Sequence, residues 1–249
     1  MKKQNLTLMA IAATLTVLHG AARAEEPPAS PFSFNVGVFS DYRYRGISQT
    51  RLKPALQGGI DFAHSSGFYL GTWVSTIKWV KDAGGDASLE VDLYGGYKGE
   101  IAKDFTYDVG VLTYQYPNNK LNPKAETTEI YGAVTFGPVT AKYSHAVSNL
   151  FGFADSKNSG YLDISASFDV GGGVMVSPHV GNQRVAKNST FSYTDYSLTV
   201  SKDFSGWLVS AAVIGTNAKK IGGVPAYFYA PSGKDLGKSG LVVGVKYSF

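Results

Sequence analysis

The sequence predicts a single up-and-down antiparallel β-barrel of about twelve strands in the outer membrane of a Gram-negative bacterium. Residues 241–249 carry apolar side chains at every odd position, and the chain ends on Phe249. The same period of two recurs in short segments along the chain, and it indicates strands with one apolar and one polar face. A last strand that ends on Phe is typical of such barrels, whose assembly machinery reads the terminal aromatic residue.

The N-terminus has the three parts of a secretory signal peptide. Two lysines follow Met1, residues 6–18 are apolar or hydroxylic, and an Ala-Arg-Ala stretch ends at Ala24. This apolar run is shorter than the roughly 18 residues of a spanning helix, so a retained anchor is the weaker alternative. We therefore predict three segments: a signal peptide (1–24), a periplasmic N-terminal spacer (25–31) and the barrel (32–249).

Composition agrees with an exported membrane barrel. The net charge of the whole chain is +4, but three of its 23 basic residues lie in the predicted signal peptide, which leaves 20 against 19 acidic residues. The mature chain is therefore nearly neutral, and nucleic-acid binding has no support. The chain has no Cys, 29 Gly, 16 Tyr and 14 Phe, a composition that suits a membrane barrel.

Twelve alternating segments follow the spacer, most of them about nine to eleven residues long, the length of a tilted membrane strand. In one of the clearest, Leu89, Val91 and Leu93 alternate with two acids and a tyrosine. One face carries acids and hydroxyls in strand after strand, and counts of ten or fourteen strands are the alternatives. The predicted strands are 32–45, 55–63, 68–79, 87–98, 105–116, 127–136, 139–147, 160–170, 174–183, 192–202, 206–215 and 240–249.

The connections distinguish a membrane barrel from a soluble sandwich, which alternation alone does not. Short connections such as 64–67 and 137–138 alternate with long ones such as 117–126 and 216–239. Short turns at one rim and long loops at the other are typical of outer-membrane barrels. We expect the short turns and both termini on the periplasmic side and the long loops outside.

Aromatic residues flank the short connections. Phe62 and Phe68 lie on either side of the first, and Phe204 and Trp207 on either side of the last. Aromatic rings favour the boundary between water and lipid, so we expect them to form the periplasmic girdle. Pro178 lies inside the ninth strand and cannot donate a ladder hydrogen bond, which predicts a bulge or a shortened strand there.

Motifs for catalysis, metals and cofactors are missing from the sequence. It has no nucleotide-binding glycine loop, no hydrolase nucleophile motif and no paired cysteines or histidines at metal spacing. Ser144 and His145 are adjacent on a strand and therefore point to opposite faces, which prevents mutual activation. We predict no cofactor, no metal and no enzymatic activity, with an outer-membrane hydrolase as the remote alternative.

The best-defined motif covers residues 40–50. On a first strand that extends to residue 45, Asp41, Arg43 and Arg45 face the lumen, whereas Tyr42 and Tyr44 face lipid. The two arginines either pair with acids across the lumen or form a positive constriction for anions, and we favour pairing. The acids expected to face the lumen are Asp61, Glu90, Asp92, Asp108, Glu129, Asp163, Asp169 and Asp195.

The same stretch carries a family resemblance. Residues 41–50 (DYRYRGISQT), 54–61 (PALQGGID) and 64–73 (HSSGFYLGTW) resemble the TorF-family porins, also catalogued as the Gcw_chp conserved hypothetical proteins. The specific match extends over about residues 34–98, and the later strands agree in pattern. The resemblance implies an outer-membrane barrel of porin type, and it supplies neither a solute nor catalytic residues.

A lumen lined by acids, arginines, lysines, tyrosines and serines suits a narrow channel for small hydrophilic solutes. The alternative is a non-conducting structural or binding barrel whose loops contact lipopolysaccharide or a partner. The expected partners are outer-membrane lipids, lipopolysaccharide, the barrel assembly machinery through Phe249, and small solutes. In the last long loop, Lys219, Lys220, Lys234 and Lys238 are candidates for lipopolysaccharide phosphates, since lysine binds phosphate readily.

Overall fold

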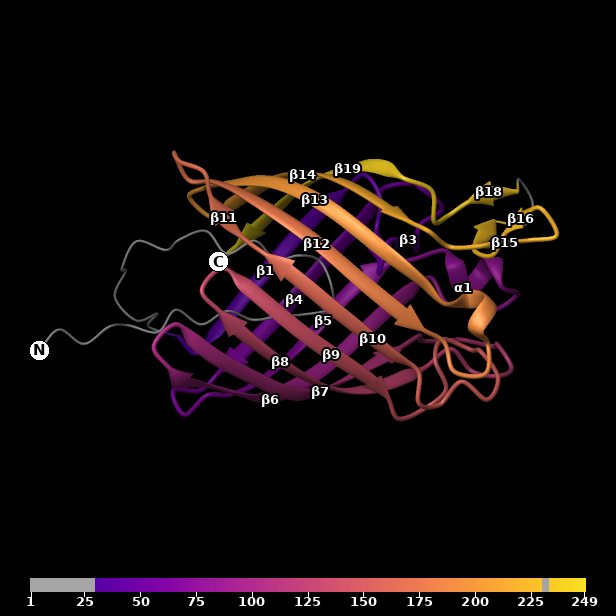
Figure 1. Cartoon of the computed structure of the whole chain (residues 1–249), viewed down its shortest axis with the longest axis horizontal. Helices are drawn as coiled ribbons and strands as arrows, with labels where there is room; N and C mark the ends of the chain where they lie inside the picture. Colours follow the sequence, from indigo (N-terminus) through magenta and orange to yellow (C-terminus); the bar gives the residue numbers. More distant parts are fainter. Residues whose placement is uncertain (1–29, 230–232) are drawn as a thin grey trace, which may run out of the picture.

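The computed structural model describes residues 30–229 and 233–249, so the predicted signal peptide and most of the predicted spacer lie outside the described residues. The described chain forms a closed antiparallel β-barrel of twelve strands (Figure 1). The predicted fold class is confirmed. In the part of the chain that the structure describes, no helix is long and apolar enough to cross a membrane.

Each strand of the barrel pairs with the next along the chain, and pairing between the first and last strands closes the wall. Two of them, β4 and β8, have the predicted bounds. The strands are β1 (Phe32–Phe39), β4 (Ala55–Ala63), β5 (Phe68–Thr76), β6 (Leu89–Ala102), β7 (Phe105–Gln115), β8 (Thr127–Phe136), β9 (Val139–Ala146), β10 (Gly160–Ala166) with β11 (Phe168–Asp169), β12 (Val174–Arg184), β13 (Tyr193–Phe204), β14 (Trp207–Thr216) and β19 (Gly240–Ser248).

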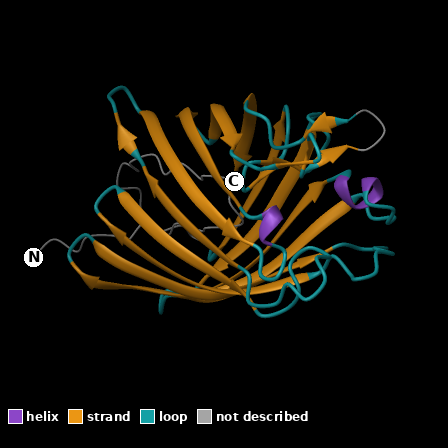
Figure 2. Ribbon diagram, turned by 45° about the vertical axis from the view of Figure 1, so that its right-hand side comes forward, coloured by secondary structure: helices purple, strands orange, loops and turns teal. Residues whose placement is uncertain are grey.

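The two ends of the barrel differ. Tight turns and the C-terminus lie at one end, and the long connections with their small elements lie at the other (Figures 1 and 2). We call these the short-turn end and the long-loop end. The small elements are β2 (Arg43–Tyr44), β3 (Ile47–Ser48), α1 (Trp79–Asp82), η1 (Ser189–Phe191), β15 (Lys220–Ile221), β16 (Val224–Pro225), β17 (Phe228–Tyr229) and β18 (Lys234–Asp235).

The two faces of the wall follow the predicted alternation. Leu93, Val109 and Ile164 are exposed on the outer face, with 49%, 49% and 44% of their surface accessible. Their chain neighbours Asp92 and Asp163 are buried inside the barrel. Apolar side chains therefore face the lipid and acidic ones face the lumen, as a strand of period two requires.

Exposed aromatic rings form a band at the short-turn end. Phe136 and Phe249 are among the most exposed side chains, at 68% and 66%. Ring contacts join neighbouring strands within this band, as between Trp207 and Tyr247, whose centroids are 4.6 Å apart. The band has the position and composition of an interfacial aromatic girdle.

The strand that contains Pro178, β12, is continuous, and the break lies in the strand beside it. β12 continues through Pro178, which pairs with Leu198 of β13, but the strand on its other side is broken between β10 and β11. The register is the same before and after that break, so there is no bulge. The prediction that the ninth strand bulges or shortens was wrong, because the missing N–H removes a ladder bond only toward one neighbour.

Candidate functional site

The segment between β1 and β4 folds into the lumen. The predicted first strand, 32–45, was too long, because β1 ends at Phe39 and residues 41–50 leave the wall. These residues, which we call the inward hairpin, contain β2 and β3, and all of residues 41–48 are buried. The chain reverses at Arg45 and Gly46, whose φ angles are +46° and +79°. The hairpin therefore lies inside the barrel near its long-loop end.

Tyr42 and Tyr44 point into the lumen, so the prediction that they face lipid was wrong. The Tyr42 hydroxyl donates to Glu90 Oε1 on β6 at 2.6 Å, and its ring packs edge-on against Trp73 of β5. The Tyr44 hydroxyl is 2.6 Å from that of Tyr114 on β7. Buried tyrosines need partners for their hydroxyls, and the lumen supplies them whereas a lipid face does not.

Arg45 connects the tip of the hairpin to the opposite wall. One terminal nitrogen donates to Glu129 Oε2 of β8 at 2.7 Å, and the other donates to Gln183 Oε1 of β12 at 2.6 Å. The guanidinium also lies 4.2 Å above the centroid of the Tyr161 ring of β10. The ion pair with Glu129 is fully buried, so loss of either partner leaves an uncompensated charge.

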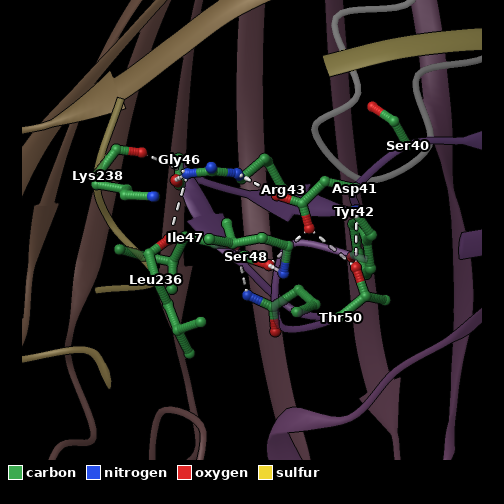
Figure 3. Close-up of polar contacts among 12 residues, drawn as sticks. Ser40, Asp41, Tyr42, Arg43, Gly46, Ile47, Ser48, Thr50, Leu236 and Lys238 are labelled. Carbon is green, nitrogen blue, oxygen red and sulfur yellow. Dashed lines mark hydrogen bonds and ion pairs between the residues drawn. The ribbon is translucent and has the colours of Figure 1, made fainter. Parts of the chain in front are cut away.

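Arg43 and Asp41 determine the shape of the hairpin and join it to the last loop (Figure 3). The Arg43 Nε donates to Asp41 Oδ2 at 2.5 Å, and one terminal nitrogen donates to the carbonyls of Gly46, Leu236 and Lys238 at 2.9–3.2 Å. Asp41 Oδ1 accepts the hydroxyls of Ser48 and Thr50 at 2.6 and 2.9 Å. The two arginines are therefore not stacked on one strand, and each is paired separately.

Gly46 is required at the tip for two reasons. Its φ of +79° lies in the left-handed region that favours glycine. A Cβ at this position would also come within 2.5 Å of Thr216 Cγ2 and 2.8 Å of Asp195 Cβ, on β14 and β13. The hairpin therefore fits closely against the wall opposite β6.

Acidic groups surround the hairpin. Glu90, Asp92 and Glu129 are all at most 2% exposed, and Arg45 pairs with the last of them. Neither carboxylate oxygen of Asp92 has a hydrogen-bond partner within the described residues. Burying a carboxylate without a partner is costly, so this part of the lumen favours positive groups.

The half of the lumen nearer the short turns is lined differently. Tyr94 donates to Asp61, and Tyr69 donates to Asp108 Oδ1 at 2.5 Å. The Lys142 ammonium lies 3.9 Å from the centroid of the Tyr131 ring. These groups belong to wall strands and no hairpin residue is bonded to them, so tyrosine–carboxylate pairs and lysines form the inner surface here.

His179 forms a cluster that the sequence analysis missed. Its Nε2 is 2.6 Å from Asp163 Oδ2, and its Nδ1 is 3.6 Å from Asp195 Oδ2. The Tyr161 hydroxyl donates to Asp195 at 3.0 Å. Strand parity places all four on the inner face, and this is the sequence signal that identifies the cluster. Asp169, by contrast, is exposed and accepts the Gly171 N–H in a turn.

Ser144 and His145, the adjacent serine and histidine of β9, do not act on each other. Ser144 is buried toward the lumen, whereas the His145 imidazole next to it is 3.3 Å from Asn158 Oδ1 on the other side of the wall. The described part of the chain contains no group of three His, Cys, Asp or Glu residues placed to hold a metal ion. The arrangement of the lumen instead suits the exclusion or passage of solutes.

The barrel has the porin fold. It is similar to the KdgM porin (TM-score 0.56, 10% identity, covering 87% of this chain and 99% of that one). It is also similar to the KdgM porin in complex with disordered oligogalacturonate (0.54, 10%, 88% and 98%), and to the NanC porin (0.53, 9%, 88% and 98%). At these identities the likeness shows the fold alone.

The chain belongs to the Gcw_chp family, described as bacterial protein of unknown function, whose model matches residues 23–249. The resemblance to the Gcw_chp family seen in the sequence is confirmed. No curated protein sequence matches the chain.

Proposed function

We propose that this protein is an outer-membrane channel for small hydrophilic solutes, and that the inward hairpin limits its width. The observation that carries the proposal is the contrast between an apolar outer face and an inner face of acids, lysines, arginines and hydroxyls. Such a lumen holds water and filters solutes by width and charge. Twelve strands lie between the filled eight-stranded barrels and the broad channels of about sixteen strands.

The finer assignments belong to the same proposal. The chain is one of the TorF-type porins, resides in the bacterial outer membrane after removal of residues 1–24, and has no enzymatic activity. The KdgM porin forms a complex with oligogalacturonate, a polyanion. The lumen of this chain is rich in acids at the level of the hairpin, so we propose small hydrophilic solutes for it rather than a polyanion.

The inward hairpin also favours a second function, a closed structural or binding barrel. Its side chains are bonded to Glu90, Glu129 and Gln183 on separate strands and to the last loop. A hairpin bonded on all these sides closes the lumen if it does not move. In that case the exposed loops carry the function, through contacts with lipopolysaccharide or a partner.

Conductance in planar bilayers distinguishes the two functions. The refolded mature chain is compared with a variant in which a short Gly-Ser linker replaces residues 42–49 of the hairpin. A matched control replaces the same number of residues, 218–225, in the last loop with the same linker. Circular dichroism and heat-modifiable gel migration verify that each variant is folded.

A channel restricted by the hairpin gives a small conductance for the wild type, a several-fold larger one for the hairpin variant and no change for the control. If wild type and hairpin variant are both folded and silent, the channel proposal is wrong. If the wild type is silent and only the hairpin variant conducts, the protein is a closed barrel whose plug must move.

The orientation is part of the proposal. The long-loop end faces outward and the short turns face the periplasm, with Phe249 available to the barrel assembly machinery. An epitope tag inserted at 155–158 is then detected on intact cells. Detection only after permeabilisation of the outer membrane would reverse the orientation.

We propose lipopolysaccharide as a partner of the last loop. Lys219, Lys220 and Lys238 are exposed there, and Lys234 is half-buried. Their ammonium groups offer point charges to phosphate. Replacing all four lysines with Gln should weaken retention of lipopolysaccharide by the purified protein, whereas Gln at Lys98 and Lys246, inside the lumen, should not. Equal retention by all variants contradicts this partner.

A further inference from the structure

The long-loop end contains a cavity of about 450 Å³, within the range of roughly 300–1,000 Å³ found for small-molecule sites. Its walls come from distant parts of the chain: the hairpin, α1, the ends of β6, β7, β12 and β13, and three long loops. Tyr44 and Gln49 of the hairpin contribute to its lining. The cavity therefore lies on the long-loop side of the hairpin, where a solute entering from that side arrives first.

Aromatic rings dominate the lining. Trp79 of α1, Phe151 and Tyr227 line the cavity, and each of these residues is half-buried. The Phe151 ring forms T-shaped contacts with neighbouring rings, with centroids 5.1 Å from Tyr114 and 5.4 Å from Tyr44. These contacts hold the rings of different elements in fixed positions.

The polar groups of the lining are neutral or acidic. No lysine or arginine lines the cavity within the described residues. Asp82 is held by Arg51, whose Nε donates to it at 2.7 and 2.8 Å, and this hydrogen bond raises the pKa of Arg51. Glu90 accepts the Tyr42 hydroxyl. The amides of Gln49 and Asn122 provide neutral hydrogen-bonding groups.

We propose that this cavity binds a neutral sugar, as a mono- or disaccharide. One face of a sugar ring presents weakly positive C–H groups that pack on the negative face of an aromatic ring. Its edge presents hydroxyls that pair with amides and carboxylates. An anionic sugar would meet Glu90 and no cation, so it is disfavoured. The inference deepens the proposed function, because it names the solute class that a channel of this kind would collect.

Binding to the refolded mature chain in detergent tests the site without a bilayer. Isothermal titration and saturation-transfer NMR are carried out with glucose, maltose and cellobiose, with digalacturonate as the anionic counterpart and choline as an organic cation. We expect saturable binding of at least one neutral sugar, and digalacturonate binding at least tenfold weaker. Tighter binding of digalacturonate, or binding of choline alone, overturns the ligand class. No saturable binding of any neutral sugar overturns the site.

Two variants locate the binding. Phe151→Leu keeps an apolar side chain but removes the ring face, and should weaken binding roughly two- to tenfold. Phe168→Leu is the same change at the short-turn end and should have no effect. Asn122→Lys adds a cation to an exposed position of the lining and should raise the affinity for digalacturonate relative to that for the neutral sugars. Equal neutral-sugar affinities of the two Leu variants would contradict binding in this cavity. An unchanged digalacturonate affinity of Asn122→Lys would contradict it as well.

The sugar-binding test and the conductance test can fail separately. Sugar binding by a protein that does not conduct keeps the site and rejects the channel. Conductance without sugar binding keeps the channel and rejects the site.

Discussion

In the long-loop half of the lumen, the hairpin residues meet fixed partners on several strands, as Arg45 meets Glu129 and Gln183. In the short-turn half, Asp61 and Asp108 are bonded to tyrosines of the wall itself. Both halves use acids, tyrosines and cations. Only the first half uses them to hold a separate segment inside the barrel.

The difference indicates that the hairpin half controls the width of the lumen and that the short-turn half controls its charge. Asp92 and Glu129 are almost fully buried at the hairpin, whereas Asp108 and Lys142 remain half-buried on the inner surface. Interactions strengthen as water is excluded, so substitutions near the hairpin should affect stability most. Substitutions in the short-turn half should affect the passage of ions more than stability.

The largest loss of unfolding free energy is expected from Glu129→Gln. The change leaves the buried Arg45 guanidinium without its counterion, and breaking a buried pair costs about 3–5 kcal/mol. Asp108→Asn, its counterpart in the short-turn half, should cost about 1 kcal/mol because its partner is a neutral tyrosine. Urea unfolding in detergent or lipid measures both. Equal losses would remove the distinction between the two halves.

A smaller loss of unfolding free energy is expected from Gly46→Ala. Left-handed backbone costs alanine about 1–2 kcal/mol, and the contact of the new Cβ with Thr216 and Asp195 adds about 1–3 kcal/mol. Gly172→Ala is the matched control, because Gly172 also has a positive φ, of +63°, and its Cβ would meet nothing within 4 Å. The difference in unfolding free energy between the two variants measures how closely the hairpin fits. No difference would mean that the tip is loosely held.

Tyr42→Phe should lower the free energy of unfolding by a moderate amount. It removes the hydroxyl that donates to buried Glu90, at a cost of about 1–3 kcal/mol. Tyr94→Phe removes the equivalent donor to Asp61, which is half-buried, and should cost less. Thermal unfolding and bilayer conductance are measured for both. If Tyr94→Phe changes conductance more than Tyr42→Phe does, the hairpin is not the constriction.

The smallest effect on stability is expected from Lys142→Gln, which should instead change selectivity. Removing a cation from the inner surface makes the short-turn half more negative, so the reversal potential in a salt gradient should shift toward cations. Arg43→Gln/Arg45→Gln should mainly lower stability, because both guanidiniums are paired with acids. A larger selectivity shift for the arginine variant would make the hairpin the charge filter.

Much of the wall could be predicted because period two is a local property. The ranges 55–63 and 127–136 coincide with β4 and β8, and the lipid face of Leu93 and the lumen face of Asp92 are as predicted. Lipid outside and water inside impose this alternation on each strand separately. The boundaries were less certain wherever a non-strand segment continued the same alternation.

The hairpin is the clearest case. Residues 40–45 continue the alternation of β1, so the sequence pattern extended the strand to residue 45. The structure ends β1 at Phe39, because Tyr42 and Tyr44 find hydroxyl partners inside the barrel and Gly46 permits the reversal. A tyrosine alternates equally well on a lipid face and in a buried hairpin, so the pattern alone does not distinguish them.

By itself the sequence determined the barrel, its two faces and the candidate lumen residues, because alternation and turn length are encoded in consecutive residues. It left the number of strands at about twelve, and the closed sheet fixed it. The partners of those residues were decided only by the tertiary structure. Arg45 and Glu129 are 84 residues apart, and Asp163, His179 and Asp195 meet through strand register. Closure of the barrel sets which positions face one another across the lumen, and this follows from the stagger of all the strands together rather than from any one segment.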